Sequence, residues 1–201
     1  MGANQNDNLV AFTMGLPGTG KTCFTSLLSA SGAIERISTD EIRVEKAIES
    51  GNETADELVY RIAIQRAIVQ AARKHVVIDA TFYKYRYREL LYQYAKTEGL
   101  CLCCFLFSMP KEVILERIQS RRNSEKSLLR SQGVKEDAAF LKICDEFEPL
   151  GDRDIGVIEF IVELEQKKRT WGYKMFKATA DSRLSVVEGL LWIASVGHFE
   201  K

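Results

Sequence analysis

Residues Leu9–Thr22 read LVAFTMGLPGTGKT, and this stretch decides the fold. Its first six residues are apolar and predict a buried β-strand over about 9–14. The next eight, GLPGTGKT, match the phosphate-binding loop pattern G-x-x-x-x-G-K-[ST] in full, and a helix is expected from Lys21 to about Ala30. A strand, this loop and a helix in succession form the context in which the pattern binds the phosphates of a nucleoside triphosphate.

The residue types of the loop suit this chemistry. Gly18 and Gly20 leave room for main-chain N–H groups to curl around an anion, and the following helix offers its positive end. Lys21 can reach the β- and γ-phosphates, and the Thr22 hydroxyl can bind Mg²⁺. We therefore predict that ATP and Mg²⁺ bind here. The predicted nucleotide contacts are Gly15, Pro17, Gly18, Thr19, Gly20, Lys21, Thr22 and Cys23.

The composition predicts one globular domain over residues 1–201. The chain has 46% hydrophobic residues, and its 28 Lys and Arg balance its 28 Asp and Glu, so no strong basic surface for duplex nucleic acid is expected. The N-terminus does not resemble a signal peptide, and no segment reaches the roughly 18 apolar residues of a membrane span. We expect a cytoplasmic protein without a membrane partner.

The five cysteines are odd in number, and three of them crowd into one apolar run at 101–104. This spacing is not that of a disulfide framework. The only histidines, His75 and His198, do not lie at metal-ligand spacing from any cysteine pair. We predict reduced cysteines in the core, and we expect Mg²⁺ with the nucleotide as the only metal.

Strands and helices alternate along the rest of the chain, which predicts a three-layer α/β fold with a mostly parallel five-stranded sheet. A mobile lid is expected at about 117–136, and a C-terminal extension at about 157–201. The expected strands cover about 9–14, 34–38, 76–81, 100–107 and 157–164, the last at a sheet edge. The expected helices cover about 21–30, 39–50, 54–74, 84–98, 110–122 and 135–147.

Two segments carry more detailed predictions. In the helix at 54–74, Leu58, Ile62 and Val69 form one apolar stripe beside Ile64, Ile68 and Ala71, so we expect both stripes in the core. In the extension, residues 171–176 suit a last strand in a hairpin, and Leu184 to Ala194 form the apolar stripe of a C-terminal helix.

Two acids follow predicted strands and are expected near the loop. In open parallel sheets the ligand lies at the carboxyl ends of the strands, which places Asp40 and Asp79 beside the nucleotide. Asp79 is expected to hold the Mg²⁺ through water, and Asp40 can take a proton from an acceptor hydroxyl. Structural roles remain open for both, with Asp40 as a helix cap and Asp79 as a turn cap.

Arginines near the predicted lid supply positive charge. Arg117 and Arg121 are spaced i and i+4, so both project from one face of a helix, and Arg122 and Arg130 follow. A lid that carries arginines over the triphosphate would exclude water and stabilise the migrating charge. The alternative is a solvated basic helix end, which the helix dipole favours without any function.

Four segments together carry a resemblance to a known family. They are the phosphate loop, Ser38–Arg43, Val76–Thr81 with Arg86 and Arg88 after it, and Leu115–Arg122. These segments resemble the small P-loop kinases (AAA_33-like) related to phage polynucleotide 5′-hydroxyl kinase. Zeta-type toxins and chloramphenicol phosphotransferase belong to the same group. The resemblance covers about residues 9–150 and implies kinase activity.

The resemblance also implies roles for single residues. Asp40 matches the general base, Arg43 matches an arginine that contacts the phosphate of the acceptor, and Arg121 matches a lid arginine that stabilises the transferred group. Thr81 and Arg86 fall on the acceptor side. In one departure, the acid that precedes the threonine directly in the polynucleotide kinase pattern is replaced by Ala80, with Asp79 one position earlier.

The sequence thus predicts an ATP-dependent phosphotransferase that acts on a hydroxyl acceptor. A nucleic-acid 5′-hydroxyl is the acceptor that the resemblance names, and a small molecule or nucleotide sugar is the alternative. A non-catalytic binding module gated by nucleotide is a hypothesis of another class. A GTPase switch is disfavoured, because the sequence contains no N-K-x-D guanine-specificity motif.

Overall fold

The computed structural model describes residues 8–30, 32–49, 52–123, 137–154, 157–167 and 170–177, without the side chains of 121–123, 137–139 and 157–177. Its centre is a six-stranded sheet in the order β2-β3-β1-β4-β5-β6. The first five strands in this order pair in parallel, whereas β6 pairs antiparallel with β5. The predicted α/β class is confirmed, and β6 adds one strand to the five expected.

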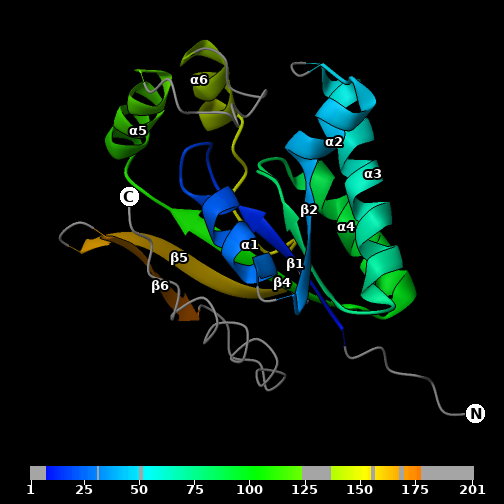
Figure 1. Ribbon diagram of the computed structural model, residues 1–201. Coiled ribbons are helices and arrows are strands. Elements are labelled where there is room, and N and C mark those ends of the chain that lie inside the picture. The colour runs from blue at the N-terminus through cyan, green and yellow to red at the C-terminus, as the bar shows by residue number, and fades with distance from the viewer. Residues whose placement is uncertain are drawn as a thin grey trace, which may run out of the picture.

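The elements alternate as the sequence predicts (Figure 1). The strands are β1 Leu9–Met14, β2 Ile34–Ser38, β3 His75–Asp79, β4 Cys101–Ser108, β5 Val157–Lys167 and β6 Thr170–Lys177. The helices are α1 Lys21–Ala30, α2 Thr39–Lys46, α3 Glu53–Ala71, α4 Tyr85–Glu98, α5 Lys111–Asn123 and α6 Asp137–Asp145.

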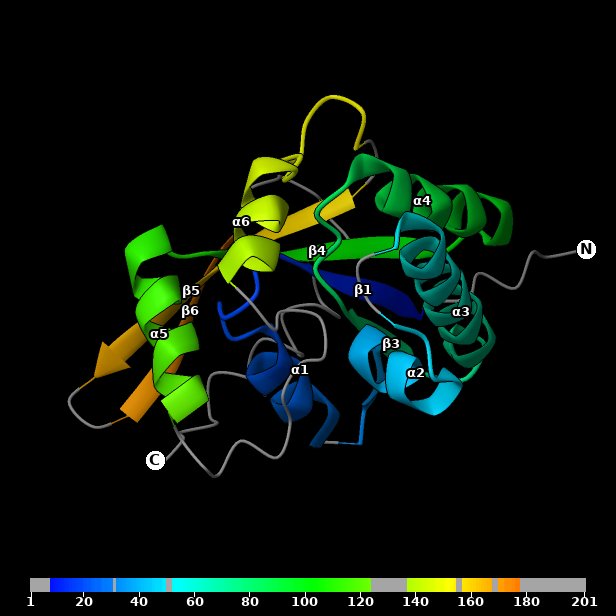
Figure 2. The same cartoon turned by 90° about the horizontal axis from the view of Figure 1, so that it is seen from above.

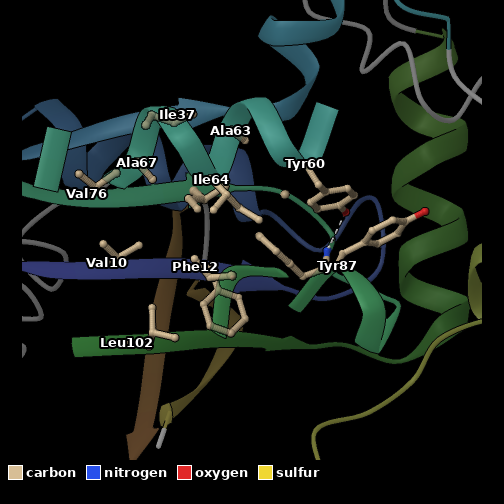
Figure 3. Close-up of a cluster of buried hydrophobic side chains, with 14 of the residues drawn as sticks. Val10, Phe12, Ile37, Tyr60, Ala63, Ile64, Ala67, Val76, Tyr87 and Leu102 are labelled. Atoms are coloured by element: carbon tan, nitrogen blue, oxygen red, sulfur yellow. Dashed lines mark hydrogen bonds between the residues drawn. The ribbon is translucent and has the colours of Figure 1, made fainter. Parts of the chain in front are cut away.

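Alternate residues of the central strand β1 lie in two separate cores, one on each face of the sheet. The sheet and the helices over its two faces form the three layers. Val10, Phe12 and Met14 of β1 belong to the core under α3 and α4, part of which Figure 3 shows. Leu9 and Ala11 belong to the opposite core under α1. Successive side chains of a strand point to opposite faces, so β1 is buried on both sides. The ribbon shows α1 on one side of the sheet and α3 on the other (Figures 1 and 2).

The face that α3 buries differs from the prediction. Leu58 and Val69, expected in the core, are 49% and 67% exposed. The buried side of the helix instead comprises Val59, Tyr60, Ala63, Ile64, Ala67 and Ala71. Small residues at positions 63, 67 and 71 allow the helix to approach the sheet closely. The close packing of this face stabilises the fold more than burial of Leu58 and Val69 would. The helix begins at Glu53 with Asn52 as its N-cap, close to the expected start at about 54.

The start of α2 and the end of α4 agree with the sequence, whereas α2 ends at Lys46, before the expected end at about 50. Ser38 is the N-cap of α2, and its hydroxyl accepts a hydrogen bond from the Glu41 N–H. Gly99 ends α4 in the left-handed conformation, as a glycine at this position favours. Of the predicted core cysteines, Cys103 and Cys104 in β4 are buried, whereas Cys23 is exposed.

The C-terminal extension is described only as far as the hairpin. The strand predicted at 157–164 exists but lies between β4 and β6, so the prediction that it forms the sheet edge is wrong. The hairpin strand predicted at 171–176 is confirmed as β6. The predicted helix around Leu184 to Ala194, and Arg130 in the predicted lid, lie outside the described residues. Among the described helices, none is long and apolar enough to span a membrane.

Candidate active site

The phosphate loop connects β1 to α1 and is held by its own lysine. The Lys21 Nζ donates to the carbonyl oxygens of Gly15 and Leu16 at 2.8 and 2.9 Å. The Thr19 hydroxyl donates to the same Leu16 carbonyl at 2.8 Å. Lys21 is 8% exposed, whereas Thr22 and Cys23 are exposed at the start of α1. The loop therefore folds around the Lys21 ammonium group. A phosphate that binds this group would replace its contacts with the Gly15 and Leu16 carbonyl oxygens.

Two loop glycines are required by their surroundings. A Cβ on Gly15 would lie 2.7 Å from the Phe107 carbonyl oxygen, and φ there is +143°. A Cβ on Gly18, where φ is +89°, would lie 3.1 and 3.2 Å from side-chain carbons of Ile114 and Ile118. These isoleucines belong to α5, so the helix that leads into the predicted lid packs directly on the phosphate loop.

Asp40 lies in the first turn of α2, close to both Lys21 and Asp79. Burial raises the pKa of the Asp40 carboxyl above its ordinary value, and the neighbouring Asp79 charge raises it further. The positive charges of Lys21, Arg43 and Arg36 lower the pKa in part. The structure thus brings together the predicted donor lysine, base and metal-side acid. A carboxylate with a raised pKa beside the loop is suited to accept a proton.

Asp79 ends β3 and is bound by an arginine that the sequence interpretation missed. Arg36 of β2 donates through Nε and Nη2 to Asp79 Oδ2, at 3.1 and 2.6 Å. The Asp79 side chain is 4% exposed. The only sequence signal of this contact is a charged residue in the middle of the short strand IERIS. Register places Ser38 opposite Asp79, so Arg36 lies two residues back along the neighbouring strand.

The residues near the loop suit Mg²⁺ bound together with a nucleotide. Thr22 offers a hydroxyl at the start of α1, and Asp79 offers a carboxylate, both of which are oxygen ligands that Mg²⁺ prefers. Within the part of the chain that the structure describes, no cluster of three or more acids, histidines or cysteines could hold a metal by itself.

Arg43, the predicted acceptor-phosphate ligand, is tied into the protein. It is 8% exposed, and its Nη2 lies 2.5 Å from Asp56 Oδ1 of α3. Its Nη1 donates to the Glu49 carbonyl oxygen at 3.4 Å. The guanidinium thus joins the end of α2 to α3, while its charge still reaches Asp40.

Thr81 lies beside the loop, because its carbonyl oxygen accepts a hydrogen bond from the Gly15 N–H at 3.3 Å. The next residue, Phe82, is fully buried and has a φ of +45°, which is unusual for a side chain of this size. Its N–H donates to the Tyr60 hydroxyl at 3.0 Å, and its carbonyl accepts from Arg88 at 3.0 Å. Two side chains, neither of which the sequence assigned here, therefore hold the turn that presents Thr81.

Arg86 and its neighbour Lys84 form ion pairs at the start of α4. The Arg86 Nη2 lies 2.9 Å from Glu53 Oε1, and the guanidinium also lies over the Tyr87 ring. Lys84 pairs with Glu53 at 2.7 Å and with Glu146 at 2.8 Å. The positive charge of this segment is therefore largely neutralised by carboxylates.

Arg88 has a structural position that the sequence did not reveal. It is fully buried and pairs with Asp154 at 2.7 Å. It also donates to the carbonyl oxygens of Glu148 and Pro149 at 2.9 and 3.2 Å. The Tyr92 hydroxyl donates to the same Asp154 carboxylate at 2.5 Å. This clamp, comprising Arg88, Tyr92 and Asp154, fastens the segment after α6 to α4.

The lid arginines are described only in part. Arg117 lies half-buried on α5, one turn after Ile114, which contacts the loop. Arg121 lies in the last turn of α5, where its side chain is outside the described residues, as is that of Arg122. Figure 1 shows α5 and α6 next to each other, and Ile114, Ile118 and Phe140 form a small core that joins these two helices. Their roles as lid arginines stay predictions.

Comparisons with known proteins agree with this arrangement. A sequence family described as an AAA domain matches residues 10–150. Among curated proteins, no sequence matches the chain.

Solved structures share the fold at low sequence identity. Kti12 from Chaetomium thermophilum, in complex with ADP-AlF3, is 15% identical with a TM-score of 0.59, over 94% of this chain and 100% of that chain. A gluconokinase from Sinorhizobium meliloti 1021 is 15% identical with a TM-score of 0.52, over 96% and 95%. A fungal RNA kinase is 12% identical with a TM-score of 0.53, over 92% of this chain and 42% of that chain.

Proposed function

The chain belongs to the AAA_33 family of small P-loop kinases, and on that premise we propose that it transfers the γ-phosphate of ATP to a hydroxyl acceptor. The observation that carries this proposal is the position of Asp40. A half-buried carboxylate with a raised pKa lies close to Lys21 of the phosphate loop. A hydroxyl bound at Asp40 would face the end of the triphosphate.

The proposed reaction assigns one task to each group. Asp40 accepts the proton of the acceptor hydroxyl, whose oxygen forms a bond to the γ-phosphorus while the bond from that phosphorus to the β–γ bridging oxygen breaks. Lys21 and the loop N–H groups hold the phosphates, and ADP leaves. Mg²⁺, when bound at Thr22 and Asp79, neutralises phosphate charge. Arg117 and Arg121 are proposed to stabilise the migrating group from the lid at about 117–136.

The positive charges on the predicted acceptor side bear on the choice between two acceptor classes. By family resemblance, a nucleic-acid 5′-hydroxyl is the first candidate, with Arg43, Thr81 and Arg86 as contacts. A specific observation favours a second candidate, an uncharged small hydroxyl compound, because Arg43 and Arg86 already pair with Asp56 and Glu53. Such cations are less available to an acceptor phosphate. We expect either reaction to take place in the cytoplasm.

The test is transfer of label from γ-labelled ATP with Mg²⁺. The acceptor panel contains 5′-hydroxyl DNA and RNA oligonucleotides, sugars, nucleotide sugars and nucleosides. Asp40→Asn is expected to lower transfer by a factor of about 10² to 10⁴ while ATP still binds. The matched control is Glu45→Gln, which changes an exposed acid of the same helix and should keep full activity. Normal transfer by Asp40→Asn would remove Asp40 as the base.

The pH dependence of transfer tests the same role. Asp40 must lose its proton to act, and its pKa is raised, so kcat/KM should rise with pH through a range above that of an ordinary aspartate at about 3.9. In Asp40→Asn this rise of kcat/KM with pH should be absent.

A nucleotide-gated binding module would yield no labelled product with any acceptor, and Lys21→Ala would then change only the affinity of a partner.

A further inference from the structure

Arg36 of β2 connects the two residues that are predicted to surround Mg²⁺. Its Nε and Nη2 donate to Asp79 Oδ2. The same Nε donates to the Thr25 hydroxyl at 3.1 Å, and that hydroxyl donates to the Thr22 carbonyl oxygen at 3.2 Å. One guanidinium thus contacts Asp79 directly and reaches the main chain of Thr22 through a single hydroxyl.

The contact is mostly shielded from water. The Arg36 side chain is 14% exposed and that of Asp79 is 4% exposed. The remaining Arg36 nitrogen, Nη1, lies 2.5 Å from Glu41 Oε1, whose side chain is 63% exposed. Charges at such sites are retained only when they are paired, and the planar guanidinium fixes its partners in direction as well as distance. Arg36 therefore holds Asp79 in one orientation.

The two hydrogen bonds that Arg36 donates to Asp79 end on the same carboxylate oxygen. Across the described residues, Asp79 Oδ1 receives no side-chain hydrogen bond, whereas Oδ2 receives two. A carboxylate that is fixed through one oxygen keeps the other for a metal or for water bound to a metal. The Thr39 hydroxyl adds a bond of 3.2 Å to the Asp79 main-chain carbonyl, so the backbone at this position is also fixed.

We propose that Arg36 is a positioning residue for the Mg²⁺–nucleotide. It sets the carboxylate of Asp79 and the Thr22 end of α1 at a fixed separation, and this geometry is what lets Mg²⁺ strengthen ATP binding. The inference rests on the proposed function, because it assumes that the loop binds ATP with Mg²⁺. It adds a residue outside the loop that controls the metal side of the same site.

Charge and positioning predict opposite effects when Arg36 is removed. A guanidinium repels a cation, so an effect of charge alone would make Mg²⁺ bind more tightly once the arginine is replaced by a neutral residue. Loss of positioning would make Mg²⁺ bind more weakly, since removal of a residue that orients a metal ligand lowers metal affinity by about 10- to 100-fold. The direction of the change therefore separates the two.

The experiment measures binding of a fluorescent ATP analogue, N-methylanthraniloyl-ATP, with Mg²⁺ and with EDTA. In the unchanged protein Mg²⁺ should tighten binding. In Arg36→Gln this tightening should fall by about 10-fold or more, while the affinity in EDTA stays close to that of the unchanged protein. Arg66→Gln is the matched control, because Arg66 also holds a carboxylate, that of Glu45, with two nitrogens, but at an exposed position. It should leave the tightening unchanged.

Two further variants cover the case in which Arg36→Gln does not fold. Arg36→Lys keeps a positive charge next to Asp79 but loses the planar fork, and it should lose most of the tightening by Mg²⁺. Thr25→Val removes the hydroxyl that leads to Thr22 and should lose part of it. Thermal unfolding checks each variant.

The outcomes separate this inference from the proposed function. If the unchanged protein does not bind the analogue in either buffer, the proposed function is wrong and the inference falls with it. If the unchanged protein shows tightening by Mg²⁺, and Arg36→Gln or Arg36→Lys shows the same or more, only the role of Arg36 is overturned.

Discussion

The predicted donor and acceptor sides of the site are built by different means. The donor side, residues 15–22, has positive φ angles at Gly15, Gly18 and Gly20, where glycine adopts them at little cost. The acceptor side, residues 38–60 and 80–88, contains Ala47 and Phe82. Among the described residues, these are the only two with positive φ that are not glycine. The donor side thus places glycine where φ is positive, whereas the acceptor side has larger residues there, and at Phe82 the side chains of Tyr60 and Arg88 hold the main chain.

The side chains that hold the acceptor side come from distant parts of the chain. Phe82 is fixed by Tyr60 and by Arg88, and Arg88 in turn is paired with Asp154. Strained residues of this kind persist only where the surroundings over-determine them. The comparison teaches that the acceptor side should be the more sensitive to changes far from the nucleotide.

The largest expected effect comes from the clamp of Arg88, Tyr92 and Asp154. Asp154→Ala would leave the fully buried Arg88 charge without its carboxylate, and removal of one partner of a buried pair costs about 3–5 kcal/mol. Burial alone would raise the pKa of Asp154, but hydrogen bonds from Arg88 and Tyr92 lower it below its ordinary value. The free energy of unfolding, measured with urea at pH 7, should fall by that amount.

An exposed ion pair serves as the control for this clamp. Glu57→Ala breaks the pair with Arg61, whose side chains are 37% and 45% exposed, and should cost only about 0.3–0.5 kcal/mol. If Asp154→Ala and Glu57→Ala lowered the free energy of unfolding equally, the clamp would contribute no more than an exposed ion pair. Because the pKa of Asp154 is lowered on folding, its stabilisation is complete above the unfolded pKa of about 3.9 and is lost as pH falls toward the folded pKa.

The difference between the two sides also explains what the sequence could predict. The loop, its strand and its helix are contiguous, so residues 9–30 are predicted almost to the residue. The Arg88–Asp154 pair joins positions 66 residues apart, and no local pattern marks which acid an arginine meets. Arg43 illustrates the limit, because its contact with an acceptor phosphate stays a prediction from family resemblance, whereas its ion pair with Asp56 was not foreseen.

The acids show the same division within the active site. Their placement at strand ends follows from the α/β alternation, so the proximity of Asp40 and Asp79 could be predicted. The contact of Asp79 with Arg36 depends on the register between β2 and β3, and a shift of one residue would turn Arg36 to the other face of the sheet. Sequence patterns do not determine such a register to one residue.

An intermediate effect is expected at the loop itself. Gly18→Ala adds a Cβ within 3.2 Å of Ile114 and Ile118 at a φ of +89°, and strained main chain of this kind costs about 1–3 kcal/mol. The free energy of unfolding should fall within this range, and N-methylanthraniloyl-ATP should bind more weakly. Gly99→Ala is the control, because φ there is +64° and no atom lies near the added Cβ. A smaller loss in Gly18→Ala than in Gly99→Ala would contradict tight packing of α5 on the loop.

The smallest expected effect is a gain on the acceptor side. Ala47 ends α2 with φ 52° and ψ 39°, a left-handed conformation that glycine adopts more readily, and the residue is exposed. Ala47→Gly should therefore raise the free energy of unfolding by about 0.5–1 kcal/mol, since the relief of main-chain strain exceeds the entropy that glycine adds to the unfolded chain. Ala72→Gly is the matched control. Ala72 ends α3 at a φ of −64°, so glycine there should lower stability. Opposite signs for the two variants in urea unfolding would show that the acceptor side retains strain where the donor side has glycine, and a loss at both positions would refute it.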